Sequence, residues 1–195
     1  MFGEVPVLPV VMPLGAAVFG VAAWHLKRRG LLTAPRVAVA LALAVYSAGI
    51  VANTVFPIFL DKPASSTPWT QFVNVTLGTG YELADAVMNV CVFVPVGMLV
   101  PLAVPRWSWL RVLTGATGLS LGIEMSQYAT AHLLAGGHIA DVNDPAFNVG
   151  GAALGLLLLT ALARAPVTAR LVDKFRWTEV VGQSEPDHRG MPSRE

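Results

Sequence analysis

Five long runs of apolar residues constrain the fold of this chain more than any other feature of its sequence. They cover residues 5–24, 37–60, 82–104, 112–134 and 147–163. A helix of about 20 residues, rising about 1.5 Å per residue, crosses the roughly 30 Å hydrocarbon core of a bilayer. Charged residues make up 13% of the chain, against about 25% in soluble domains. The sequence therefore predicts an all-α, polytopic membrane helix bundle with five transmembrane helices.

The placement of Lys and Arg predicts how this bundle is oriented. Twelve of the 13 lie between runs one and two, between runs three and four, or after run five, and Lys62 lies in the connection between runs two and three. Positive residues favour the cytoplasmic side, so we expect the amino terminus outside and the carboxyl terminus in the cytoplasm. Residues 1–165 are expected to form the transmembrane domain. Residues 166–195 are expected to form a cytoplasmic tail, with a surface helix near 171–181 and an end of disordered composition.

Several functional classes find no support in the sequence. The net charge is +1 and no basic face is apparent, so no nucleic-acid partner is expected. Cys91 is the only cysteine, which excludes an intramolecular disulfide and a thiolate metal cage. His138, Asp141 and Asp144 carry donors that suit zinc, but no HExxH or paired-histidine spacing accompanies them. No metal or cofactor is therefore predicted.

The polar residues of runs three, four and five gather on the predicted outer side. Asp85 and Asn89 are four residues apart, which puts them on one helix face. Glu124 lies roughly 15 Å below the outer end of its run at a helical rise, where an acid is costly and usually functional. We expect these residues to line a polar cleft that opens to the outside. Its predicted members are Asp85, Asn89, Glu124, Gln127, His138, Asp141, Asn143, Asp144 and Asn148.

Glu124 needs a neutral partner, because runs three, four and five contain no Lys or Arg close to it. Gln127, Tyr128 and Asn89 are the candidate partners if Glu124 is neither protonated nor hydrated. An alternative reading makes Asn89 and Gln127 simple interhelical hydrogen-bonding residues, each bond stabilising by about 0.6 kcal/mol. The loop over 141–144 has its own alternative, which is to cap and turn the chain into the fifth helix ahead of a proline.

Two GxxxG motifs predict close helix contacts. Gly118 and Gly122 form one motif in run four, and Gly151 and Gly155 form the other in run five. Small residues at this spacing let helix backbones approach closely. We therefore expect runs four and five to pack against each other along these glycines.

The order of the polar motifs resembles the VanZ-like family of teicoplanin-resistance-associated membrane proteins. The pieces are Asp85 and Asn89 followed by FVPVG at 93–97, then Ile123-Glu124 with Gln127, then Asp141, Asn143 and Asp144 followed by Asn148 and Gly151. The likeness covers roughly residues 37–159. Two positions depart from the family pattern, because His138 stands where an arginine is common and Asn143 where an aspartate is more usual. A histidine pairs with carboxylates only when it is protonated, which would make this loop sensitive to pH.

The resemblance implies a multi-pass protein of the bacterial cytoplasmic membrane that acts near the cell envelope. We expect the cleft to bind an envelope lipid, a cell-wall precursor or a glycopeptide such as teicoplanin. One alternative is an intramembrane enzyme, in which Glu124 acts as general acid or base with Asp141 or Asp144. Another is proton-coupled transport through Glu124, which the lack of an internal repeat disfavours. The sequence leaves open whether any reaction is catalysed, and it does not indicate the oligomeric state.

Overall fold

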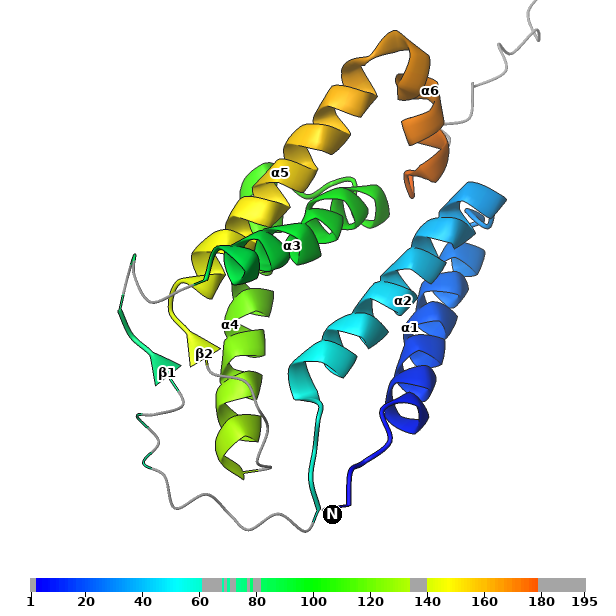
Figure 1. Cartoon of the computed structure of the whole chain (residues 1–195). Helices are drawn as coiled ribbons and strands as arrows, with labels where there is room; N and C mark the ends of the chain where they lie inside the picture. Colours follow the sequence, from blue (N-terminus) through cyan, green and yellow to red (C-terminus); the bar gives the residue numbers. More distant parts are fainter. Residues whose placement is uncertain are drawn as a thin grey trace, which may run out of the picture.

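A computed structural model of the 195-residue chain describes residues 3–60, 68, 70, 73–76, 78, 82–133 and 140–178. Within these residues it contains helices and two very short strands (Figure 1). In chain order they are α1 (Leu8–Arg28), α2 (Ala34–Val55), β1 (Val73–Asn74), α3 (Leu83–Ala103), α4 (Trp109–Leu133), β2 (Ala140–Asp141), α5 (Asp144–Arg164) and α6 (Pro166–Phe175). The predicted all-α class is confirmed.

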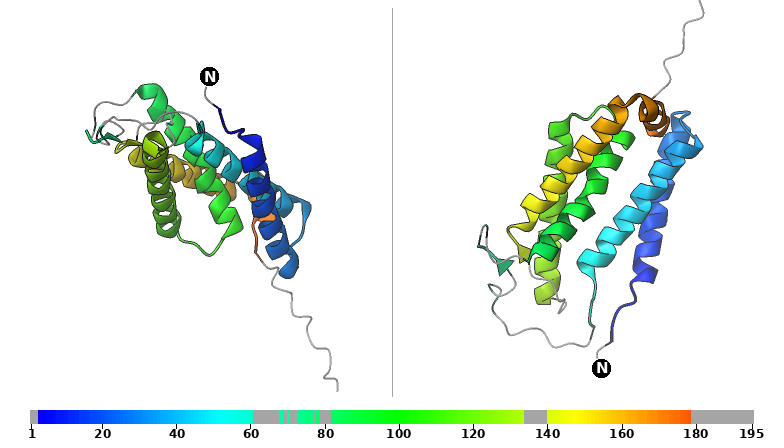
Figure 2. Two further views of the ribbon diagram at one scale, coloured as in Figure 1. Left: turned by 90° about the horizontal axis from the view of Figure 1, so that it is seen from below. Right: turned by 45° about the horizontal axis from the view of Figure 1, so that its top comes forward.

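The helices form two groups that lie side by side. Helices α1 and α2 make one antiparallel pair, and α5 packs along α3 and also contacts α4 and α6 (Figures 1 and 2). Four of the described helices are long and apolar enough to cross a membrane, namely α1, α2, α3 and α5. Helix α4 has 25 residues but does not meet the same apolar standard. Four of the five predicted spans are thus present as long apolar helices, while the count of five and the orientation remain predictions.

Prolines mark several helix boundaries. Helices α2, α5 and α6 each carry a proline in their first two positions, where its missing N–H costs no hydrogen bond. Helix α2 ends at Val55, two residues before Pro57, because the residue before a proline disfavours the helical conformation. Helix α6 begins at Pro166, so the surface helix predicted over 171–181 was placed too far along the chain, and residues 179–181 lie outside the described part.

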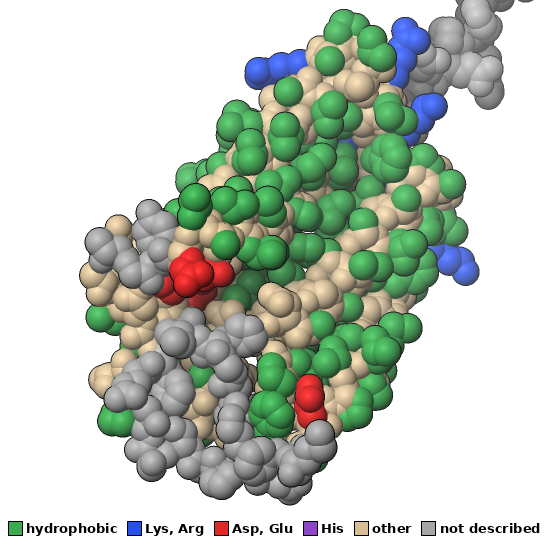
Figure 3. Space-filling model, viewed as in Figure 1, with side chains coloured by type: hydrophobic (Ala, Val, Ile, Leu, Met, Phe, Trp, Pro, Cys, Tyr) green, Lys and Arg blue, Asp and Glu red, His purple; other side chains and the backbone are tan. Residues whose placement is uncertain are grey.

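The ends of α1, α3 and α5 come together in a hydrophobic cluster with the chain that follows α6. Leu26, Leu102, Leu159 and Trp177 are among its buried members. The ends that meet here are joined by the Lys- and Arg-rich connections, so we call this end of the molecule the basic end. Figure 3 shows Lys and Arg side chains there, while a group of Asp and Glu side chains lies away from it.

The glycines of α5 face α3, and this corrects the predicted helix pairing. A side-chain carbon added at Gly155 would overlap the carbonyl oxygen of Val94 on α3. Nothing lies within 4 Å of the corresponding positions at Gly118 and Gly122 on α4. The expectation that the two glycine motifs pack α4 against α5 is therefore wrong. Small residues permit a close approach, but they do not specify which helix approaches.

Candidate functional site

The site is built around a parallel bridge between two segments that are far apart in the sequence. Val73 pairs with Ala140, and Asn74 pairs with Asp141. The backbone N–H of Val142 also donates to the carbonyl oxygen of Asn74, at 3.1 Å. The connection that precedes α3 is thereby held against the loop that enters α5.

Glu124 reaches this loop from α4. Its Oε2 atom accepts a hydrogen bond of 2.9 Å from the backbone N–H of Asp141. The carboxylates of Asp141 and Asp144 lie close enough to interact with Glu124 electrostatically. The acid in the middle of α4 therefore belongs to the same group as the aspartate loop. Its partner is the main chain of that loop, whereas the sequence suggested side chains from α3 and α4.

The Asp141 carboxylate is the centre of the hydrogen-bond network. Its Oδ2 atom accepts from Asn74 Nδ2 at 2.8 Å. Its Oδ1 atom accepts from both the backbone N–H and the side-chain Nδ2 of Asn143, each at 2.8 Å. Because both oxygens are engaged with the protein, Asp141 serves mainly to fix the shape of the loop.

Asn143 joins the segment that contains Thr76 and Gly78 to the loop by hydrogen bonds. Its side chain is buried, and Nδ2 also donates to the carbonyl oxygen of Thr76 at 3.0 Å. Its Oδ1 atom accepts from the backbone N–H of Gly78 at 2.7 Å. Sequence reasoning missed Asn74 and Thr76 as parts of this site. No periodic pattern signals a bridge of two residues between distant segments.

Helix α3 contributes Asn89 and Asp85 to this group of side chains. The side chain of Asn89 donates a hydrogen bond to Asp144, the first residue of α5. Asp85 lies one turn earlier on α3, is exposed, and acts on Asp144 electrostatically together with Asp141. The first turns of α3 and α5 therefore meet at the aspartate loop.

Asn148 and Gln127 each have a buried side-chain oxygen near the acids in the sequence. Asn148 is 2% exposed, and its Nδ2 donates to Ser120 Oγ on α4 at 2.9 Å. The Oδ1 atom of Asn148 and the Oε1 atom of Gln127 are buried and accept no hydrogen bond from the described residues. An unsatisfied buried acceptor costs about 1–3 kcal/mol, so both atoms would gain from a donor.

His138 lies outside the residues that the structure describes, so its predicted place in the cleft is not addressed. Among the His, Cys, Asp and Glu residues that are described, no group of three or more is arranged to hold a metal ion.

Charge and hydrogen-bonding capacity define what the site can accept. Asp144 interacts electrostatically with Asp85 and Asp141, and Glu124 interacts with Asp141 and Asp144. Ionised carboxylates accept hydrogen bonds but do not donate them. Figure 3 shows acidic side chains grouped near β1 and β2, away from the basic end. The arrangement suits hydroxyl, amide N–H and ammonium groups, and it disfavours anions.

Comparison with known families places this geometry in context. A family model described as VanZ/LLP1 matches residues 43–163, more than half of the chain. The chain belongs to the VanZ/LLP1 family. The match extends from α2 into α5, so it includes Glu124, the aspartate loop and the facing turns of α3. Together with the four apolar helices, it makes this an integral membrane protein of that family. No curated protein and no solved structure matches the chain.

Proposed function

We propose that this VanZ/LLP1 family protein binds a ligand rich in hydrogen-bond donors at the outer face of the bacterial cytoplasmic membrane. The observation that carries the proposal is the convergence of Glu124, Asp141 and Asp144 from α4, β2 and α5 around one hydrogen-bonded loop. Of the three expected ligand classes, the site favours a glycopeptide antibiotic such as teicoplanin, or the sugar–peptide portion of a cell-wall precursor. The charge of the site argues against the phosphate of a lipid headgroup.

The physical reason is complementarity between acceptors and donors. A glycopeptide presents sugar hydroxyls and amide N–H groups, which pair with carboxylate oxygens in charge-assisted hydrogen bonds. The buried oxygens of Gln127 and Asn148 offer further acceptors. A phosphate would instead meet several negative charges within a region of reduced dielectric constant, where like charges repel strongly.

The residues of the site divide into two roles. Asp141 and Asn143 hold the loop in shape through bonds to Asn74, Thr76 and each other. Glu124 and Asp144 are the acids that would contact the ligand. Asn89 positions Asp144 through its hydrogen bond.

Teicoplanin susceptibility of a bacterium that expresses the full chain tests this proposal. Glu124→Gln and Asp144→Asn each replace a carboxyl group by an amide with little change in shape, and both are expected to reduce the protein's effect on susceptibility. Asp173→Asn is the matched control, because Asp173 is an exposed acid on α6 at the basic end. If both site variants reach the membrane at normal levels and act like the unsubstituted protein, the proposal fails.

A second function is favoured by the interaction between Glu124 and Asp144. Two interacting carboxylates in different environments can divide the roles of acid and base, so the same site would suit an enzyme acting on a lipid-linked substrate. Turnover by purified protein separates this function from binding alone. An enzyme would lose turnover in Glu124→Gln, whereas a binding protein would show no turnover in either form.

A further inference from the structure

A pocket lies at the basic end, away from the acidic site. It has a volume of about 170 Å³ and is enclosed by the α3–α4 connection, α5 and the residue that follows α6. Trp107 and Trp109 come from the connection or the start of α4, Thr160 comes from α5, and Arg176 closes the pocket from the chain after α6. Two kinds of side chain that carry N–H donors, indole and guanidinium, therefore line one cavity, while the Thr160 hydroxyl donates to the carbonyl oxygen of Leu156 at 2.7 Å.

The main chain fixes Arg176 at this pocket. Its carbonyl oxygen accepts a hydrogen bond of 2.8 Å from Nε of Arg36, which is a buried residue on α2. Arg36 Nη2 donates to the carbonyl oxygen of Thr178, also at 2.8 Å. On the other side, the backbone N–H of Trp177 donates to the carbonyl oxygen of Leu102 on α3, at 2.9 Å. The backbone at Arg176 is thus held between α2 and α3 without help from its own guanidinium.

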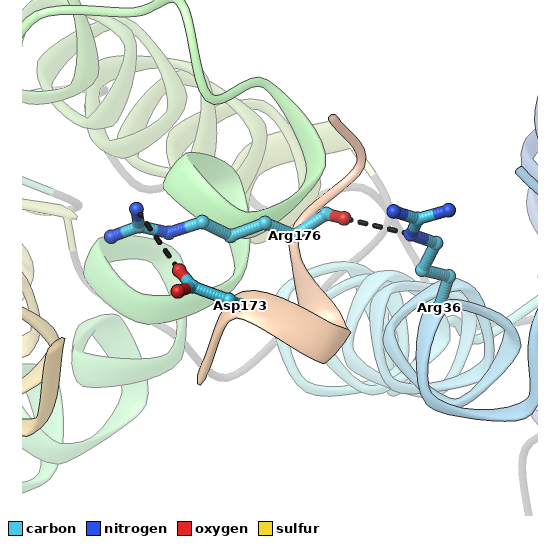
Figure 4. Close-up of polar contacts among 3 residues, drawn as sticks. All are labelled: Arg36, Asp173 and Arg176. Carbon is cyan, nitrogen blue, oxygen red and sulfur yellow. Dashed lines mark hydrogen bonds and ion pairs between the residues drawn. The ribbon is translucent and has the colours of Figure 1, made fainter. Parts of the chain in front are cut away.

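The Arg176 guanidinium itself is only weakly paired. Figure 4 shows it directed away from Arg36 and toward Asp173. The Nη1 atom lies 3.6 Å from Asp173 Oδ1, and the side chains of Arg176 and Asp173 are 36% and 67% exposed. Ion pairs as exposed as this one stabilise by at most about 1 kcal/mol. A stronger anionic partner inside the pocket would therefore displace Asp173.

The surface beside the pocket indicates the source of such an anion. Val167 and Leu171 project from one face of α6 and are 90% and 54% exposed. Arg164, Arg170 and Lys174 are exposed close to them in the sequence. Exposed apolar and basic side chains on one short helix suit the boundary between acyl chains and anionic headgroups. Tryptophan is likewise favoured at that boundary.

From these observations we infer that the pocket at the basic end binds the phosphate group of an anionic phospholipid, with Arg176 as its principal ligand. Arginine forms paired hydrogen bonds with phosphate oxygens. Basic pockets between membrane helices bind anionic headgroups in this way. The inference does not depend on the acidic site, since it concerns different residues at another end of the molecule.

The test is a titration of the purified full-length protein in detergent with short-chain phosphatidylglycerol, followed by tryptophan fluorescence. Two indoles line the pocket, so occupancy is expected to change the emission. Arg176→Gln should weaken binding about tenfold, the amount that losing one charge-assisted hydrogen bond represents. Lys27→Gln removes one positive charge from an exposed position on α1, at the basic end but outside the pocket, and should change affinity by less than about threefold. Asp173→Asn should tighten binding, because it removes the competing acid.

Three results would overturn the inference. Equal weakening by Arg176→Gln and Lys27→Gln would indicate general attraction to a basic surface. Equal affinity for short-chain phosphatidylcholine would show that the anionic headgroup is not recognised. Binding of inorganic phosphate as tight as that of phosphatidylglycerol would make this a free-phosphate site. Circular dichroism of each variant shows whether it has folded, and the opposite effects expected for Arg176→Gln and Asp173→Asn cannot both arise from misfolding.

Discussion

Replacing Asn143 by aspartate tests whether an amide is required at the centre of the loop. The substitution keeps the shape of the side chain and leaves the oxygen that accepts from Gly78 in place. It replaces the amide nitrogen, which donates to Thr76 O and to Asp141 Oδ1, by an oxygen. Two hydrogen bonds then become contacts between acceptors, one of them between two carboxylates.

The expected cost follows from these two bonds. A bond between neutral groups contributes about 1 kcal/mol net, and a bond to a charged group about 1.5–3 kcal/mol. Asn143→Asp should therefore lower the free energy of opening the loop by about 3 kcal/mol, before any repulsion between the carboxylates is added. Because each 1.4 kcal/mol is a factor of ten, the population of the opened loop should rise about a hundredfold.

Hydrogen–deuterium exchange of the purified protein measures this opening directly. The reporters are the amides of Gly78 and Val142, which are both hydrogen-bonded within the bridge region. Their exchange should be about a hundred times faster in Asn143→Asp, while amides in α1 and α2 stay unchanged. Asn53→Asp, the same chemical change at an exposed position on α2, is the control and should leave both reporters unaffected. Protection within about threefold of the original protein would refute the assigned role of Asn143.

Two further substitutions test the packing of the fold. Gly155→Ala should lower the thermal unfolding temperature in detergent, because its methyl group would meet Val94 O and overpacking typically costs about 1–3 kcal/mol. Gly122→Ala is the control and should leave the unfolding temperature nearly unchanged, because its methyl group meets nothing within 4 Å. Equal effects of the two substitutions would contradict the α3–α5 contact. Arg36→Gln should release the chain at Arg176, because it removes the bonds to the carbonyl oxygens there. Limited proteolysis should then cut after α6 much faster, and an unaltered cleavage rate would contradict the role of Arg36.

Much of the fold could be predicted because the apolar runs are long and the polar residues are few. The spacing of Asp85 and Asn89 put them on one face of α3, and both act on Asp144 in the structure. Proline near the start of α5 was likewise expected from its favourable place in the first helical turn. These features rest on local rules, which act within one or two helical turns.

The contacts between distant segments could not be predicted from such rules. The side chain of Asn74 donates a hydrogen bond to Asp141, which is 67 residues further along the chain. A bridge of two residues is too short to produce a periodic pattern in the sequence. The glycines of α5 predicted a close approach of another helix but not which helix it would be, since α3 and α4 both contact α5. The structure also gives a physical reason for the unusual Asn143. Its amide donates to two acceptors, which an ionised aspartate cannot do.

Binding measurements on the purified protein test the central claim most directly. Titration calorimetry with teicoplanin and with a soluble sugar–peptide fragment of the cell wall should detect binding of at least one of them. Glu124→Gln should weaken that binding about tenfold, the effect expected for one lost charge-assisted hydrogen bond, while Asp173→Asn at the basic end should not change it. Binding of neither ligand by the folded protein, or equal binding by Glu124→Gln, would contradict the assignment of Glu124 and the aspartate loop to a ligand site.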